Sequence, residues 1–206
     1  MQIGVFGGTF DPVHVGHLIV AEQCREQARL DQVLFIPAAR PPHKQDRPLT
    51  PFPRRVEMLQ LATAGHAAFH VDELEKNRPG YSYTADTLDE LHQRNPEADL
   101  WLIIGSDCLP DIPGWHEPTQ IIAAAGLLVV PRAGSSIWSA AELRSTLRLT
   151  SEVALRYRVV EMPPIDISSR DVRRRVEAGR TIRYLVPRAV ECYIQAHALY
   201  SDAKED

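Results

Sequence analysis

Apolar runs and amphipathic segments alternate along the chain, and this alternation constrains the fold more than any other feature. Residues 32–37 (QVLFIP), 100–104 (LWLII) and 127–130 (LLVV) are continuous apolar runs, which are typical of strands buried on both faces of a parallel sheet. Residues 2–6 (QIGVF) form a similar first run. Strands that alternate with helices predict an α/β fold with a doubly wound, Rossmann-like parallel sheet.

Helix signals fall between these runs. Residues 15–29 place Leu18, Ala21 and Ala28 at helical spacing. Caps, prolines and glycines predict further helices: from Thr50 and Pro51 to about Ala64, from Thr84 to Asn95, a short one from Pro118, from Ser168 or Ser169 to Gly179, and from Pro187 to about Leu199. Weaker strand signals lie at 69–74 and 159–162, with a loop over 110–115. We expect a single domain over 1–206, with a small C-terminal helical appendage over about 164–206.

Composition excludes several classes of protein. The 206 residues are 44% hydrophobic and 24% charged, so the chain can bury a full core without disulfides. A net charge of -4 argues against nucleic acid as a partner. The three cysteines are far apart, and the longest apolar stretch, 121–130, is too short to span a bilayer. Gly4, Gly7 and Asp11 come too early for the apolar core of a secretory signal, so we expect a cytoplasmic protein without a membrane partner.

The segment 7–17 (GGTFDPVHVGH) lies where the first strand ends and the first helix begins. Backbone N–H groups and the helix dipole favour phosphate there, and glycines allow a ligand to approach the backbone. His14 and His17 share one face of the first helical turn and can donate to phosphate oxygens. Three alternative interpretations of the segment are weaker. A metal site would need a third ligand, and none is obvious; a dinucleotide-binding fingerprint would need GxGxxG, which is absent after the strand. A plain structural turn would not explain two histidines beside a glycine.

A second helix start also suits an anion. Ser168 and Ser169 can cap the helix that follows, and Arg173 adds a fixed cation one turn later. Arg174 and Arg175 fit a solvated helix face equally well.

The two segments together resemble the HxGH nucleotidyltransferase superfamily. Residues 167–173 (ISSRDVR) are similar to its second motif, Ile-Ser-Ser-Thr-x-Ile-Arg, with Arg170 where the motif has threonine. Residues 41–44 (PPHK), the Tyr83-Thr84-x-x-Thr87-Leu88 pattern, 104–107 (IGSD) and the Trp115 loop resemble the bacterial nicotinic acid mononucleotide adenylyltransferases. The resemblance covers nearly the whole chain.

The resemblance implies transfer of the adenylyl group of ATP to nicotinate mononucleotide, giving deamido-NAD and pyrophosphate. Its implied catalytic residues are His14, His17, Lys44 and Arg173. The implied ATP-binding residues are Gly8, Thr9, Phe10, Gly16, Gly105, Asp107, Arg132, Ser168 and Ser169. Those for the nicotinate nucleotide are Thr84, Trp115 and His43.

Several of these assignments have a physical basis and an alternative. Lys44 lies in a basic loop that could grip phosphate or simply be solvated. Thr84 could cap a helix whose N–H groups bind the nicotinate carboxylate. Trp115 could stack on the pyridine ring or pack as local core. Asp107 can accept from ribose hydroxyls, and Arg132 follows a buried strand at the ligand edge.

The expected mechanism is a direct in-line attack by a phosphate that is already largely dianionic, with no protein base and no covalent intermediate. Mg²⁺ would bind mainly through ATP, without a cage of protein ligands. The alternatives are an HxGH transferase acting on phosphopantetheine or on a nicotinamide nucleotide, and a non-catalytic nucleotide sensor on the same fold.

Overall fold

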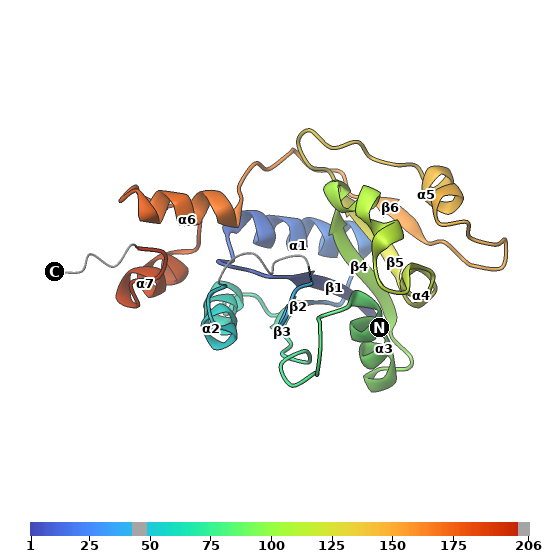
Figure 1. Cartoon of the computed structure of the whole chain (residues 1–206), viewed down its shortest axis with the longest axis horizontal. Coiled ribbons are helices and arrows are strands. Elements are labelled where there is room, and N and C mark those ends of the chain that lie inside the picture. Colours follow the sequence, from blue (N-terminus) through green and yellow to red (C-terminus); the bar gives the residue numbers. More distant parts are fainter. Residues whose placement is uncertain (43–48, 202–206) are drawn as a thin grey trace.

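The computed structural model describes residues 1–42 and 49–201. Its centre is an all-parallel sheet with the strand order β3-β2-β1-β4-β5-β6 (Figure 1). The strands are β1 (Gln2–Gly8), β2 (Gln32–Pro37), β3 (Phe69–Val71), β4 (Asp99–Gly105), β5 (Gly126–Val130) and β6 (Tyr157–Val159). The helices are α1 (Val15–Ala28), α2 (Phe52–Thr63), α3 (Thr84–Arg94), α4 (Pro118–Ala124), α5 (Ala140–Thr146), α6 (Ser169–Glu177) and α7 (Arg188–Ala196), and a 3-10 helix, η1 (Ser106–Gly114), follows β4. This strand order is that of a doubly wound sheet, so the predicted fold class is confirmed.

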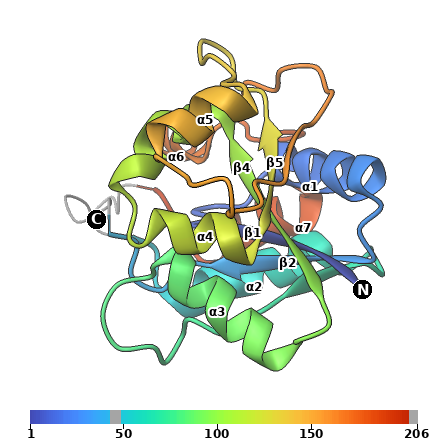
Figure 2. The ribbon, with the colours of Figure 1, turned by 90° about the vertical axis from the view of Figure 1, so that its right-hand side faces the viewer.

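Each face of the sheet has its own hydrophobic core. In β4, Leu102 and Ile104 face a core shared with α3 and α4, whereas Ile103 faces a core shared with α1 and α2. Figure 2 shows α3 and α4 in front of the strands, on the face opposite α1 and α2. Because both faces are covered, the central strands are apolar at nearly every position.

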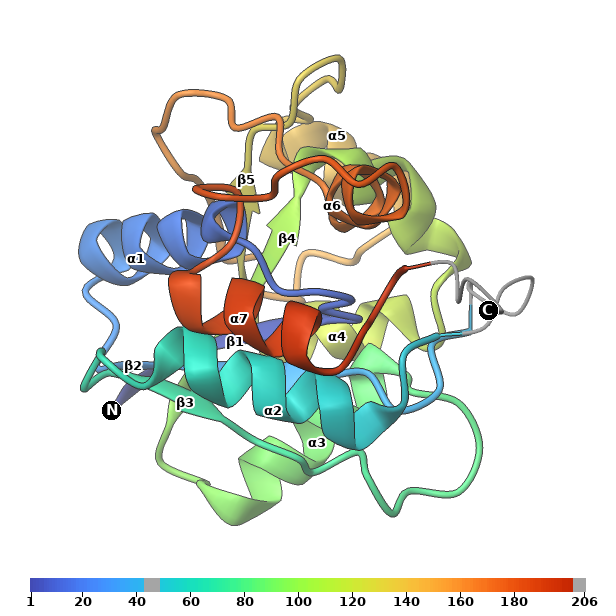
Figure 3. The same cartoon turned by 90° about the vertical axis from the view of Figure 1, so that its left-hand side faces the viewer.

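The C-terminal part returns to the first core. Helix α7 packs against α2, and Figure 3 shows the two helices side by side. Val172 of α6 and Val190 and Ile194 of α7 are buried in the same core as α1 and α2. The backbone N–H of Val15 also donates to the carbonyl of Leu185 at 2.9 Å, so the start of α1 is joined to the chain before α7. The C-terminal helices thus pack on the first core and beside the N-terminal end of α1.

Several predicted boundaries were wrong. Thr50 does not cap α2: Pro51 is the N-cap residue, and no side chain caps the helix. Thr84 does not cap α3 either, since the extended Tyr83 is the cap and Thr84 is the first helical residue. Strand β3 is shorter than 69–74, and β6 comes earlier than 159–162 because Tyr157 pairs with Leu127.

Two elements were not expected. The predicted loop after β4 is instead mostly the 3-10 helix η1. Helix α5 was missed, although Ser139 and Glu142 form a capping box. The Ser139 hydroxyl accepts from the backbone N–H of Glu142, and the backbone N–H of Ser139 donates to the Glu142 carboxylate. In the part of the chain that the structure describes, no helix is long and apolar enough to cross a membrane.

Candidate active site

The candidate site lies at the carboxyl edge of the sheet, where β1 pairs with β2 on one side and β4 on the other. In doubly wound sheets, ligands bind at this switch in strand order. A cavity of about 790 Å³ opens here. Its wall brings together four segments far apart in sequence: His14, His17, Asp107, Arg132, Ala133, Ser135, Ile165, Asp166, Ile167, Ser168, Ser169, Arg170 and Arg173.

Residues 9–14, called the 9–14 loop below, connect β1 to α1. Phe10 has a left-handed backbone (φ 48°) and is only 2% exposed, and its ring packs edge-on against Phe6 at 5.5 Å. A Cβ atom at Gly8 would lie 3.0 Å from the Phe10 ring, so glycine leaves room for it. Burial of Phe10 thus holds a backbone conformation that non-glycine residues rarely adopt.

A buried arginine secures the start of this loop. Arg55 of α2 is 1% exposed, and its guanidinium donates to the carbonyls of Thr9 at 2.8 Å, Ala38 at 2.9 Å and Thr50 at 2.9 Å. Burial lowers the pKa of Arg55, while the charge of Asp11 raises it. Arginine stays charged in proteins, so Arg55 is a permanent donor here. Removal of its side chain would leave three carbonyls without this hydrogen-bond donor.

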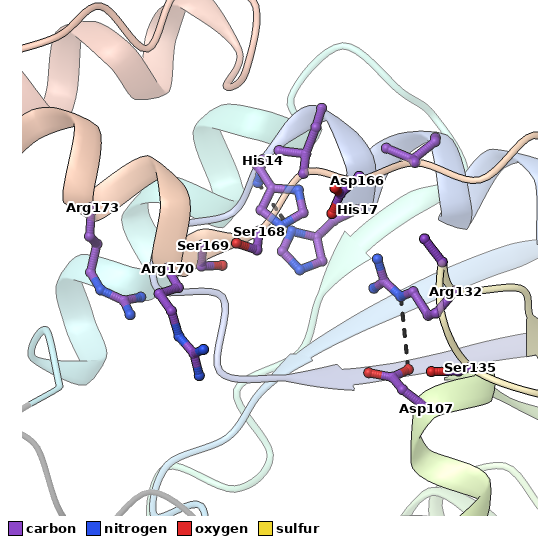
Figure 4. A pocket seen from close by; sticks show the side chains of 13 residues that line it. His14, His17, Asp107, Arg132, Ser135, Asp166, Ser168, Ser169, Arg170 and Arg173 are labelled. Carbon is purple, nitrogen blue, oxygen red and sulfur yellow. Dashed lines mark hydrogen bonds and ion pairs between the residues drawn. The ribbon is translucent and has the colours of Figure 1, made fainter.

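His14 and His17 form a stacked pair over the cavity. Their ring centroids are 3.6 Å apart with an interplanar angle of 24° (Figure 4). The backbone N–H of His14 donates to Nδ1 of His17 at 3.1 Å, so a neutral His17 carries its proton on Nε2. A Cβ atom at Gly16 would lie 3.0 Å from Nδ1 of His14, so glycine is needed beside the ring.

His14 is the more buried member of the pair. It is 2% exposed, and burial, followed by the charge of Arg132, lowers its pKa to about 4. The ring is therefore neutral at pH 7. Its Nδ1 atom is buried and has no hydrogen-bond partner among the described residues. A buried polar atom of this kind on a cavity wall indicates a ligand that completes the hydrogen bonding.

The start of α6 is attached to the 9–14 loop. Ser168 caps the helix by accepting from the backbone N–H of Asp171 at 3.1 Å. The Ser169 hydroxyl donates to the carbonyl of Pro12 at 2.8 Å, and the Arg173 guanidinium donates to the carbonyl of Asp11. The two segments that resemble the superfamily motifs, 7–17 and 167–173, thus meet in space.

Tyr200 adds a further contact to the same loop. Its hydroxyl donates to Oδ1 of Asp11 at 2.7 Å, and burial followed by the Asp11 charge raises the pKa of Tyr200. Sequence reasoning missed the roles of Asp11, Arg55 and Tyr200, because the sequence alone does not say which distant group each side chain reaches.

Asp107 and Arg132 face the histidine pair from the ends of β4 and β5. Nε of Arg132 lies 3.9 Å from Oδ1 of Asp107 (Figure 4), and the Arg132 backbone N–H donates to the Ser106 hydroxyl at 3.0 Å. A Cβ atom at Gly105 would lie 2.1 Å from Oδ1 of Asp107, so a larger residue there would force the Asp107 carboxylate to move. Gly105 therefore supports the position of Asp107 and does not itself line the cavity.

Two smaller cavities lie on the other side of the end of β1. One of about 110 Å³ is lined by Gly8, Thr84 and Trp115 among others, and one of about 340 Å³ by Tyr83, Thr84, Trp115 and His116 among others. Trp115 is half-buried and packs against the core with α3 and α4, while also lining both cavities. The two alternatives for Trp115 are thus compatible.

The remaining site predictions divide into two groups. Thr9, Phe10, Gly16 and Gly105 line none of the three cavities and support the residues that do. His43 and Lys44 lie outside the described residues. Burial raises the pKa of Cys24 to about 12 and, with nearby carboxylates, that of Cys108 to about 11, so neither is a thiolate nucleophile at pH 7.

Comparison with known proteins adds to this geometry. Residues 5–175 match the family model described as cytidylyltransferase-like. A probable nicotinate-nucleotide adenylyltransferase of Thermomicrobium roseum is 45% identical, over 97% of this chain and 91% of the relative. One of Thermus thermophilus is 44% identical, over 97% of this chain and 100% of the relative. The solved Plasmodium falciparum nicotinic acid mononucleotide adenylyltransferase, complexed with NaAD, has a TM-score of 0.79 at 19% identity, over 97% of each chain. At 19% identity that likeness shows the fold alone.

Proposed function

This chain belongs to the cytidylyltransferase-like family and, within it, to the nicotinate-nucleotide adenylyltransferases, and from that premise we propose a reaction for its cavities. It transfers the adenylyl group of ATP to nicotinate mononucleotide, giving deamido-NAD and pyrophosphate. One observation carries the proposal: the end of β1 separates a large cationic cavity holding His14 and His17 from smaller cavities holding Thr84 and Trp115. Two nucleotides bound there would meet at this point.

The proposed chemistry is a direct displacement. The mononucleotide phosphate attacks the α-phosphorus of ATP, the bond to the β-phosphate breaks, and pyrophosphate leaves. A phosphate monoester has a second pKa of about 6, so it needs no protein base at pH 7. The site would act by positioning and by stabilising charge.

His14 and His17 would serve as hydrogen-bond donors to the transferred phosphoryl group. Nδ1 of His14 lacks a partner in the described chain, and a neutral His17, which accepts at Nδ1, carries its donor proton on Nε2. Arg173 and Arg132 would add fixed positive charge, with Lys44 as a further predicted cation. Asp107 would accept from the ribose hydroxyls.

The smaller cavities suit a nicotinate group. The first N–H groups of α3, starting at Thr84, have no partner within the helix and lie at its positive end. A carboxylate gains from this charge and an amide does not. Trp115 offers an aromatic face in the same cavities.

Mg²⁺ would accompany ATP. Asp107 and Asp166 line the large cavity and carry the oxygen ligands that Mg²⁺ prefers. The described residues contain no cluster of three His, Cys, Asp or Glu side chains that could hold a metal ion. We propose that the ion is held mainly by the phosphate oxygens of ATP, where it would neutralise charge. The cytoplasmic location and the single domain stay predictions.

Pyrophosphate release from ATP with each pyridine mononucleotide tests the proposal. We expect turnover with nicotinate mononucleotide and a lower kcat/KM with nicotinamide mononucleotide, because only the former is charged at the α3 terminus. Phosphopantetheine serves as a third acceptor. Equal kcat/KM for the two pyridine nucleotides would overturn the carboxylate site, preference for phosphopantetheine would overturn the substrate, and no turnover with any acceptor would favour a nucleotide sensor.

A further inference from the structure

Arg170 stands where the superfamily motif has threonine, and it lines the large cavity together with Arg173. Its neighbours differ from it in their contacts. Arg173 donates to the Asp11 carbonyl, Arg174 pairs with Asp171, and Arg175 donates to the Thr181 carbonyl at 2.9 Å. Arg170 has no hydrogen bond or ion pair among the described residues.

The position of Arg170 in α6 does not help the helix. With Ser168 as N-cap, Arg170 is the second helical residue, where the helix dipole is positive. A cation there is repelled by the helix end, and carboxylates are the favoured residues in this turn. Arg170 also lies three residues before Arg173, so the two share one helix face. An anion bound between them would remove both repulsions.

The cavity shows where such an anion would lie. Figure 4 places Arg170 and Arg173 on one side of the histidine pair and Asp107 with Arg132 on the other. If ribose is bound at Asp107 and the α-phosphate at the histidines, the triphosphate continues toward Arg170. The unpartnered Nδ1 of His14, from a ring only 2% exposed, marks the same cavity as a ligand site.

We propose that Arg170 binds the β- and γ-phosphates of ATP, and hence the leaving pyrophosphate, as a second guanidinium beside Arg173. The inference rests on the proposed function. It assigns a substrate contact to the residue at which this chain departs from the motif.

The reverse reaction isolates this contact, because pyrophosphate is then a separate substrate that attacks the adenylyl phosphorus of deamido-NAD and releases ATP and the mononucleotide. For Arg170→Gln we expect the KM for pyrophosphate to rise about tenfold and the KM for deamido-NAD to stay within twofold. Arg170→Lys should recover part of the loss, since it keeps the charge without the guanidinium fork. Arg174→Gln, on the same helix but paired with Asp171, is the matched control and should change neither KM.

Two further measurements complete the test. Calorimetric titration with magnesium pyrophosphate should show about tenfold weaker binding for Arg170→Gln and unchanged binding for Arg174→Gln. This result is expected even if the wild-type protein proves to have a different acceptor. The Tm of Arg170→Gln without ligand should equal or exceed that of the wild type. Unchanged pyrophosphate binding in Arg170→Gln, equal weakening in Arg174→Gln, or a lower Tm with both KM values raised alike would each overturn the proposal.

Discussion

His14 and His17 show how one short segment gives two similar side chains different environments. Stacking at 3.6 Å leaves little room for two cations, and burial keeps His14 neutral at pH 7. His17 is oriented by the backbone N–H of His14. His14 is therefore a neutral ring at pH 7, and a neutral His17 would carry its proton on Nε2.

The pKa of His14 predicts how stability depends on pH. The unfolded ring takes up a proton as pH falls below 6.5, whereas the folded ring resists until about 4. The unfolded state thus binds more protons between these values, so the stability is fully present above pH 6.5 and is lost as pH falls toward 4. Compared with His14→Gln, the wild-type protein should lose about 2 to 3 kcal/mol more between pH 7.5 and 4.5. Urea unfolding of both proteins at several pH values measures this, and parallel curves would contradict it.

His17 should matter for kcat. Loss of a donor aimed at developing charge costs on the order of 3 kcal/mol, so His17→Ala should lower kcat by about a hundredfold or more. The KM for the mononucleotide should change little. His92→Ala, an exposed histidine on α3, is the control and should retain wild-type rates. A His17→Ala enzyme within a few-fold of wild type would make the ring structural.

At the scale of elements, the segment after β4 joins the two halves of the site. Asp107 at its start lines the large cavity, and Trp115 just after η1 lines the small ones. Ser106, fully buried, accepts from the Arg132 backbone and so links this segment to the end of β5. A shift of η1 would therefore disturb both nucleotides.

Trp115→Ala tests the part of this segment that faces the mononucleotide. Ring stacking is worth about 0.5–1.5 kcal/mol beyond burial, so we expect the KM for nicotinate mononucleotide to rise up to about tenfold and the KM for ATP to stay nearly constant. A modest fall in Tm should accompany it, because Trp115 also packs on the core. Trp115→Phe should recover most of the KM. If the Ala variant is destabilised but keeps its mononucleotide KM, Trp115 is not in the site.

Sequence patterns predicted the strands that are buried along nearly their whole length. They missed helix α5 and the residues whose role depends on one distant contact. Strands β2, β4 and β5 were recognisable because both of their faces are covered. Helix α5 has a capping signal in Ser139 and Glu142 that could have revealed it. The motifs singled out His14, His17 and Arg173, which line one cavity in the structure, whereas the support from Arg55 depends on tertiary packing that no local motif records.

At the scale of the whole molecule, the 9–14 loop is held from three directions. Arg55 binds its start, Ser169 and Arg173 bind the Pro12 and Asp11 carbonyls, and Tyr200 binds the Asp11 side chain. The C-terminal part is thus a wall of the site as well as a cover for the core. We predict that 1–206 behaves as one domain for this reason.

Tyr200→Phe removes one of these supports without changing volume much. Loss of a buried hydrogen bond typically costs about 1 kcal/mol, so the free energy of unfolding should fall by that amount. The KM for ATP should rise a few-fold while the KM for the mononucleotide stays constant, because the 9–14 loop carries His14. Tyr184→Phe is the control, because Tyr184 is 85% exposed, and it should change neither the free energy of unfolding nor the KM for ATP. Equal changes in the two variants would contradict the role of Tyr200.

The contact between Tyr200 and Asp11 also bears on the synthesis of the chain, since the two residues are 189 positions apart. Ribosomes add about 5–20 residues per second, so Asp11 is made about 10 to 40 seconds before Tyr200. During that interval Arg55 is made before α6 and Tyr200, so it is the first of these partners available to the 9–14 loop. A chain that stops short of Tyr200 therefore carries both histidines and lacks part of the frame that orients them.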